Sequence, residues 1–242
     1  MAENRDAGEI APSGLVAPVA HGLAGIEAVG HRDYVGGLWE QIGRLQFDYL
    51  CAQGLEPRHV LVDIACGALR GGVHFIPYLE PGHYLGIDKE AELIDRGVRE
   101  ELPAAVRESQ RPELLVSDSF EFGRFSRRPD FALAQSLFTH LPPDVIQECL
   151  TALRGVARRG CRLFATFFEV GETAVNPPEA HDHLLWHYTR QEMLELGRRA
   201  GWRGHYLGDW GHPRGQMMIS YQPRPRLWPS TARPRRPAAG RG

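Results

Sequence analysis

Three acidic residues stand at the ends of short apolar segments, where carboxylates could bind the polar groups of a nucleoside. The segment 59–65 (HVLVDIA) contains Asp63 and runs into a turn at Gly67, which can approach a ligand closely because it has no Cβ. Asp88 follows the apolar run YLGI, 21 residues after Gly67, where a carboxylate can accept both hydroxyls of a ribose. Asp118 follows a third such segment and could accept the exocyclic amine of adenine. Either Asp88 or Asp118 could instead cap the next helix.

The segments between these residues predict an alternation of strands and helices. Apolar and β-branched runs predict seven strands, over residues 59–65, 83–87, 113–117, 130–135, 161–168, 203–207 and 216–222. Apolar residues spaced three and four apart predict helices from Gly37 to Gly54 and over 90–107, 144–157 and 189–200, with a further helix after CGALRGG. Pro103 could cut the helix over 90–107 short. The last of these begins with a capping box formed by Thr189 and Glu192.

This order of elements predicts an α/β fold: a seven-stranded, mostly parallel sheet with helices on both faces and an antiparallel last strand. Five strands that alternate with helices require right-handed parallel crossovers. The sixth and seventh strands are separated by a loop too short for such a crossover, so they should form an antiparallel hairpin. Ligands bind outside the carboxyl ends of strands in open sheets of this kind, and this is where the three aspartates fall.

The stretch Asp63-Ile64-Ala65-Cys66-Gly67-Ala68-Leu69 resembles the cofactor motif of the class I S-adenosylmethionine-dependent methyltransferases, an acidic residue followed by alternating glycines. Ala65 and Leu69 stand where the family usually has glycine, and Gly67 keeps the central one. The phrases SLFTHLPP and YTRQEMLELGRRAGW and the hairpin ending also look like the family. The resemblance runs from about Tyr34 to Gln222.

The resemblance implies S-adenosyl-L-methionine as the cofactor and a binding site built by four loops. Asp88 is expected to bind the ribose. Asp118 and its neighbours Ser119 and Phe120 are expected to surround the adenine, and the residues after the fourth strand are expected to face the cofactor. The full set expected to bind the cofactor is Asp63, Ala65, Cys66, Gly67, Asp88, Lys89, Asp118, Ser119, Phe120, Gln135 and Ser136.

Methyl transfer is an in-line displacement at a sulfonium, so catalysis consists mainly of positioning. A base is needed only where the acceptor has a proton to lose, and histidine serves near neutral pH. His140, in FTHLPP after the fourth strand, is the candidate catalytic residue. The alternative is that His140 packs as a structural residue between loop and helix.

The acceptor is expected to contact the N-terminal stretch, the loop after the fifth strand and the hairpin turn. Trp39 could instead be a core anchor. His181-Asp182-His183 could bind a metal, but this loop gives the three residues no fixed scaffold, and we expect no metal. Arg214 could pair with an acidic substrate or simply order its turn. The residues expected to contact the acceptor are Tyr34, Trp39, Glu169, His181, His183 and His212.

The leading interpretation is methyl transfer to O, N or C of a small molecule, a secondary metabolite or similar compound. The alternative is a cyclase or isomerase that binds S-adenosylmethionine on the same fold without net methyl transfer. A nicotinamide-dependent oxidoreductase is disfavoured because the GxGxxG spacing is missing. A nucleic-acid or protein methyltransferase would need a basic groove or an added domain.

Composition sets the remaining expectations. The chain has 242 residues, 43% hydrophobic and 24% charged, as in globular proteins, and a net charge of −2. Residues 222–242 carry six Arg, five Pro and no acidic residue. We expect a flexible segment at 1–33, a methyltransferase domain with an N-terminal helical lid at 34–222, and a disordered tail at 223–242.

The cysteines and the chain start bear on location and partners. The four cysteines, Cys51, Cys66, Cys149 and Cys161, show no metal spacing and read as reduced thiols, which predicts a cytoplasmic protein. No signal peptide, membrane span or nucleic-acid partner is expected; a homodimer is possible.

Overall fold

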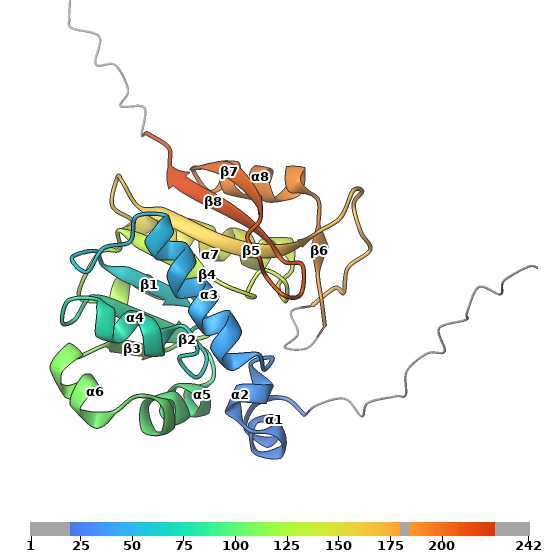
Figure 1. The fold of residues 1–242 in the computed structure, drawn as a ribbon. Coiled ribbons are helices and arrows are strands. Elements are labelled where there is room, and N and C mark those ends of the chain that lie inside the picture. Colours follow the sequence, from blue (N-terminus) through green and yellow to red (C-terminus); the bar gives the residue numbers. More distant parts are fainter. Residues whose placement is uncertain (1–19, 180–183, 226–242) are drawn as a thin grey trace, which may run out of the picture.

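A single twisted sheet forms the centre of the molecule (Figure 1). The computed structural model describes residues 20–179 and 184–225. The strands follow the order β3-β2-β1-β4-β5-β8-β7, and β6 pairs with the end of β5. They are β1 (Leu61–Ile64), β2 (Tyr84–Asp88), β3 (Glu113–Val116), β4 (Phe131–Ala134), β5 (Arg162–Glu169), β6 (His187–Tyr188), β7 (Trp202–Asp209) and β8 (Met217–Pro223).

The direction of the strands confirms the predicted mostly parallel sheet and its antiparallel end. β3, β2, β1, β4 and β5 run parallel, with Asp63 beside Gly86 of β2 and Leu133 of β4. β8 runs antiparallel to both β5 and β7. A long β7–β8 hairpin is therefore the outer edge of the sheet, as the short loop between the two strands requires.

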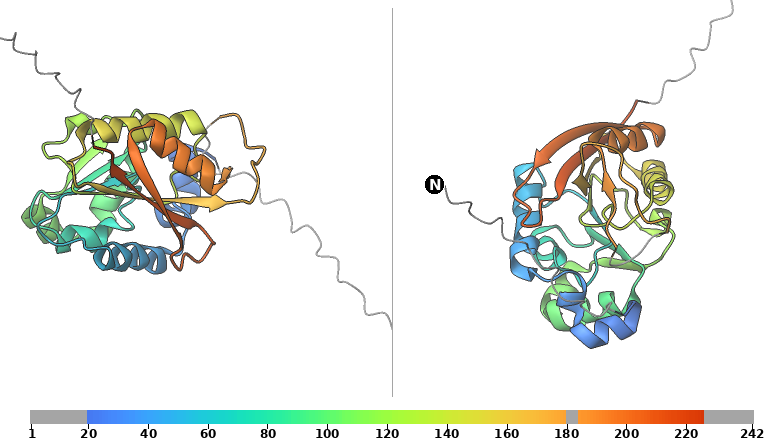
Figure 2. Two further views of the ribbon diagram at one scale, coloured as in Figure 1. Left: turned by 90° about the horizontal axis from the view of Figure 1, so that it is seen from above. Right: turned by 90° about the vertical axis from the view of Figure 1, so that its right-hand side faces the viewer.

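Helices cover both faces of the sheet (Figure 2). α3 and α4 contact each other on one face, and α7 and α8 on the other. The strand residues alternate accordingly, since Val60, Val62 and Ile64 join one buried cluster and Leu61 the other. The helices are α1 (Gly22–Val29), α2 (His31–Tyr34), α3 (Trp39–Ala52), α4 (Gly72–Tyr78), α5 (Ala91–Arg96), the π-helical η1 (Gly97–Glu101), α6 (Ala104–Gln110), the 3-10 turn η2 (Phe122–Arg124), α7 (Pro143–Val156) and α8 (Arg190–Arg199).

Two elements differ from the sequence prediction. The sheet has an eighth strand, β6, two residues long, which a periodicity of side chains cannot reveal. The helix predicted over 90–107 is divided into three pieces: it widens into η1 after Arg96, which was not predicted, and it is interrupted at Pro103, where the sequence allowed a break. Thr189 does cap α8, and its capping box with Glu192 is present.

The N-terminal part of the described chain is helical, although the composition of residues 1–33 predicts flexibility. α1 and α2 lie against the body through Ile26, which is fully buried with Trp39, Ala68 and Leu93. Amino-acid composition cannot predict a single apolar contact of this kind. We refer to residues 20–37 as the lid. No helix in the two described ranges is long and apolar enough to cross a membrane.

Candidate functional site

A cavity of about 810 Å³ opens at the carboxyl ends of β1, β2, β3 and β4. The lid and the β7–β8 turn contribute Tyr34 and Arg214 to its wall. Twelve of the predicted site residues line it together: Tyr34, Asp63, Ala65, Cys66, Gly67, Asp88, Lys89, Asp118, Phe120, Gln135, Ser136 and His140.

Other predicted residues lie elsewhere. Trp39 is buried with Ile26 and stacks edge-on against His31 of the lid, so it anchors the lid. Glu169 accepts hydrogen bonds from Arg190 and Tyr206 and does not line the cavity. Ser119 and His212 also stand outside the cavity wall, whereas His181 and His183 fall outside the described residues.

The turn after β1 keeps the conformation of a glycine motif despite its two substitutions. Ala65, Gly67 and Leu69 have φ angles of 61°, 53° and 66°, so every second residue is left-handed. L-amino acids avoid this region because Cβ approaches the following carbonyl. A Cβ placed on Gly67 would come 3.0 Å from Cγ1 of Val35 in the lid. The lid therefore packs directly on the turn, and a side chain at Gly67 would require Val35 to shift.

The left-handed backbone at Ala65 predicts effects of different size for two substitutions. Ala65→Gly should change the free energy of unfolding by less than about 1 kcal/mol, because relief of strain offsets the greater entropy of the unfolded chain. Ala65→Val should lower it by about 2 kcal/mol, since β-branched side chains are outliers at positive φ. Urea unfolding of the two variants checks this, and equal stabilities would contradict the assigned backbone.

Asp88 ties the end of β2 to the turn. One carboxylate oxygen accepts the backbone N–H of Gly67 at 2.8 Å, and the other accepts that of Glu90 at 2.9 Å. The side chain is buried, and burial raises the pKa of Asp88 although both backbone donors oppose the shift. Each oxygen keeps a second lone pair, so Asp88 can still accept from a ligand in the cavity.

Asp63 is held beneath the turn by Tyr84, whose hydroxyl donates to it at 2.8 Å. Burial raises the pKa of Asp63 to about 6, against the stabilising bond from Tyr84 and with a further rise from the nearby charge of Asp88. Arg70 also lowers the pKa of Asp63, so Asp63 is harder to ionise than an exposed aspartate but still loses its proton near neutral pH, and it lines the cavity.

The raised pKa of Asp63 predicts the sign of a pH effect. The folded state binds its proton more tightly than the unfolded state, so the contribution of Asp63 to stability falls as pH rises from about 4 to about 6. The full difference is about 3 kcal/mol at 1.36 kcal/mol per pKa unit. Asp63→Asn should remove this part of the pH dependence, because an amide does not titrate. The check is the difference between the pH–stability curves of wild type and variant, and parallel curves would contradict it.

A network of polar side chains that are mostly buried connects β5 with the residues after β4 and before β8. Gln135 donates to Ser136 Oγ at 2.7 Å, and Gln216 donates to the same oxygen at 2.7 Å. Thr166 donates to Gln216 at 2.7 Å and accepts the backbone N–H of Ser136 at 2.7 Å. Ser136 has a φ of 57°, so this network holds a strained residue on the cavity wall.

Two arginines connect this network to the lid. Arg70 donates to the carbonyls of Val35 and Gly37, each at 3.0 Å, and to Gln135 at 2.8 Å. Arg214 donates to the carbonyl of Gly36 between them at 2.6 Å. Three consecutive carbonyls of the lid are thus bound by guanidinium groups of the body.

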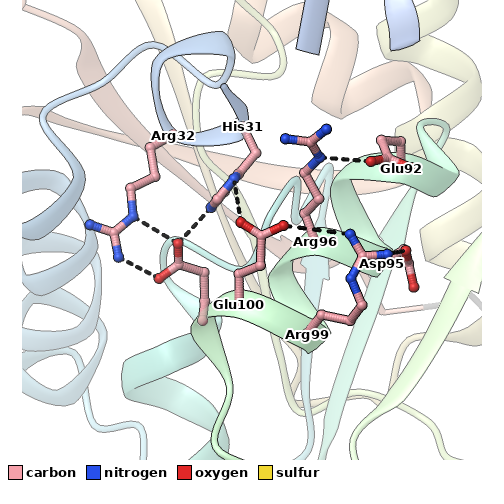
Figure 3. Close-up of polar contacts among 8 residues, drawn as sticks. His31, Arg32, Glu92, Asp95, Arg96, Arg99 and Glu100 are labelled. Atoms are coloured by element: carbon pink, nitrogen blue, oxygen red, sulfur yellow. Dashed lines mark hydrogen bonds and ion pairs between the residues drawn. The ribbon is translucent and has the colours of Figure 1, made fainter. Parts of the chain in front are cut away.

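The opposite side of the lid is fixed by ion pairs to η1 (Figure 3). Arg32 donates to both oxygens of Glu101, at 2.7 and 2.6 Å, and this contact lowers the pKa of Glu101. His31 contacts the same carboxylate at 2.5 Å and Glu100 at 3.5 Å. The two sets of contacts hold the lid over the turn and one side of the cavity.

His140 stands on the cavity wall between β4 and α7. Its Nδ1 lies 2.9 Å from the carbonyl oxygen of Leu184, and because a carbonyl can only accept, Nδ1 carries the proton. In the neutral ring Nε2 then has the lone pair, as a general base requires. Trp186 also fixes this segment, since its backbone N–H donates to the carbonyl of Thr139 at 2.9 Å.

Several residues that line the cavity were not predicted from the sequence. Arg70 follows the turn directly, and Gln46 interrupts the apolar stripe of α3 one helical turn after Ile42. For these two residues, the sequence signal was a charged or amide side chain in an otherwise apolar stretch. Gln216, directly before β8, carried no such signal in the sequence. In the described ranges, no three side chains of His, Cys, Asp or Glu gather as a metal site would need.

Solved structures of methyltransferases are similar to this arrangement, whereas no protein-family model matches the chain. The DhpI–S-adenosylhomocysteine complex is 18% identical, covers 81% of this chain and 92% of its own, and has a TM-score of 0.59. The glycopeptide N-methyltransferase MtfA with S-adenosylmethionine is 13% identical, covers 76% of this chain and 94% of its own, and has a TM-score of 0.58. Magnesium protoporphyrin IX methyltransferase from Synechocystis PCC 6803, with bound S-adenosylmethionine, is 14% identical over 75% and 80%, with a TM-score of 0.53. The chain has the methyltransferase fold.

Proposed function

We propose that the chain is a methyltransferase that binds S-adenosyl-L-methionine in this cavity and transfers the methyl group to O, N or C of a small molecule. The observation that carries the proposal is the left-handed turn around Gly67, bonded to Asp88 and facing Asp118 across one cavity. These residues fit the cofactor, since the left-handed turn at Gly67 is closely approached by the lid and Asp88 retains acceptor capacity.

In this proposal each residue has a role that follows from its place in the cavity. Asp88 accepts the ribose hydroxyls and Asp118 the amine of adenine. S-adenosylmethionine supplies a methyl group on a positively charged sulfur, so the protein must chiefly hold the acceptor in line with it. The lid restricts water, and His140 takes the proton that an O–H or N–H acceptor loses.

The size of the cavity supports a small acceptor. Sites for small molecules span roughly 300–1,000 Å³, and about 810 Å³ is near the upper end, which leaves room for cofactor and acceptor together. Two of the similar structures are named for a porphyrin and a glycopeptide. We therefore propose a secondary metabolite or similar compound as the acceptor.

Ligand binding tests the cofactor. S-adenosylmethionine and S-adenosylhomocysteine at a hundredfold excess over Kd should stabilise the protein by about 2.7 kcal/mol, whereas NAD should leave the melting temperature unchanged. If neither sulfur compound raises the melting temperature, the proposal fails. Methyl-labelled cofactor then tests the reaction, because transfer releases S-adenosylhomocysteine and moves the label to product. Retention of the label during turnover would favour a cyclase or isomerase.

Two substitutions of His140 separate its chemical from its structural role. His140→Ala should lower turnover by about a hundredfold with an O–H or N–H acceptor while cofactor affinity stays within about twofold. His140→Asn should be equally slow, because its amide can replace the Nδ1–H bond to Leu184 but has no basic nitrogen. The measurement is release of S-adenosylhomocysteine with an acceptor found by screening. Activity restored in the Asn variant would show that His140 is structural.

A further inference from the structure

Arg70 is the only arginine among the residues 20–179 and 184–225 that is buried, and its partners are all neutral. It donates to two lid carbonyls and to Gln135, and its Nε has no hydrogen-bond partner. No carboxylate in the described part of the chain forms an ion pair with it. Buried charges are normally paired, and the nearby charge of Asp63 opposes the lowering of the Arg70 pKa only in part, so this guanidinium is incompletely neutralised by the protein.

Arg214 brings a second positive charge to the same end of the cavity. It projects from the β7–β8 turn, lines the cavity, and contacts only the carbonyl of Gly36 among the polar partners described. The charge of Arg214 adds to burial in lowering the pKa of Arg70 to about 10. Burial and the same two arginines lower the pKa of His212 to about 4, so the neighbouring imidazole is neutral. The two guanidinium groups therefore repel each other, and the charge of Asp63 compensates only in part.

The carboxylates of the cavity gather at the other end. Asp88, Glu90 and Asp118 follow β2 and β3, where the proposed function places ribose and adenine. Glu148, on α7, borders a second depression shared with Phe120, on the adenine side. Asp63 lies beneath the turn and is bonded to Tyr84. The cavity thus has an acidic half for the nucleoside and a basic half at Arg70 and Arg214.

The cofactor alone does not balance the basic half. At neutral pH its amino-acid carboxylate is offset by its own ammonium, and the sulfonium leaves it with one net positive charge. Bringing that charge next to two guanidinium groups is unfavourable unless an anion joins them. We infer that the methyl acceptor carries an anionic group, a carboxylate or another oxyanion, that binds to Arg214 and Arg70 in the basic half of the cavity. This inference rests on the proposed function.

Paired probes test the inference on the full-length protein saturated with S-adenosylhomocysteine. A set of carboxylic acids, each matched with its own primary amide, is titrated, and binding is followed by tryptophan fluorescence. Trp210 serves as the reporter because it stacks on His212 in the same turn as Arg214. We expect the acids to bind at least tenfold more tightly than their amides. Arg214→Gln should abolish this preference and Arg214→Lys should retain part of it, because lysine keeps the charge.

A matched control and a second ligand pair decide between the sources of the anion. Arg203→Gln removes an exposed arginine of the same hairpin outside the cavity and should behave as wild type. The affinities of S-adenosylhomocysteine and 5′-methylthioadenosine, which lacks the amino-acid end, should keep their ratio in Arg214→Gln. If that ratio collapses, Arg214 binds the cofactor carboxylate and the inference is overturned.

Two further results would overturn the inference in different ways. Acids that bind no better than amides to the wild type, or a preference that Arg203→Gln removes as effectively as Arg214→Gln, would refute the acidic acceptor and leave the proposed function intact. A wild type that binds neither S-adenosylhomocysteine nor 5′-methylthioadenosine would refute the proposed function itself, and the inference with it.

Discussion

Asp88→Ala is expected to weaken the binding of S-adenosylhomocysteine by between about tenfold and a hundredfold. The carboxylate loses its bonds to the ribose, and hydrogen bonds to charged groups contribute about 1.5–3 kcal/mol. The variant also frees the N–H of Gly67, which Asp88 accepts at 2.8 Å, so the turn loses the contact that orients it toward the ligand. Calorimetric titration of the folded variant measures the loss.

The comparison variants for Asp88 isolate its position from its charge. Asp95→Ala removes an exposed carboxylate of α5, whose partner is Arg99, and should leave affinity unchanged. Asp88→Asn should bind almost as poorly as Asp88→Ala, since its amide nitrogen must face the N–H of either Gly67 or Glu90. A folded Asp88→Ala protein that binds within twofold of the wild type would remove Asp88 from the site.

Arg70→Met should produce the largest loss of stability among the cavity residues. The change leaves the carbonyls of Val35 and Gly37 and the oxygen of Gln135 without their donor. Each unpaired buried group costs about 1–3 kcal/mol, and access of water to the lid limits the total to about 3 kcal/mol. In a domain of this size the melting temperature should fall by about 6–12 °C.

Limited proteolysis gives a second measure for Arg70. Trypsin should cleave faster after Arg32 in the Arg70→Met variant, because release of the lid exposes this backbone. Arg44→Met is the control, as Arg44 is exposed on α3, where it pairs with Asp48 and lies over the ring of Phe47, both weak contacts at an exposed surface. If the two variants melt and are cleaved alike, the contacts of Arg70 do not hold the lid.

The residues around the turn show which parts of the site could be predicted. Asp63, Gly67 and Asp88 are close in sequence to the strands that carry them, so the order of strands and loops was enough to bring them to one sheet edge. The left-handed backbone at Ala65 and Leu69 was not evident, because neither residue type favours it. That conformation is imposed by the surrounding packing rather than by local preference.

The basic half of the cavity depended on contacts between distant segments. Arg70 and Arg214 are far apart in the chain and meet the lid carbonyls only after the hairpin folds back over β5. Trp39 and Glu169 lie in segments near the cavity but do not face it. Trp39 packs against Ile26, and Glu169 accepts a hydrogen bond from Arg190. Spacing along the chain carries no information on such orientations.

The sequence by itself determined the α/β alternation, the parallel sheet with its terminal hairpin, and the edge at which Asp63, Asp88, Asp118 and His140 stand, because side-chain periodicity and loop length act locally. Only the tertiary structure decided which side chains face the cavity, that α1 and α2 dock as a lid, and that Arg70 is buried with no ion pair to a carboxylate among the described residues. Those outcomes depend on packing between segments remote in sequence, where a single contact such as that of Ile26 outweighs local composition.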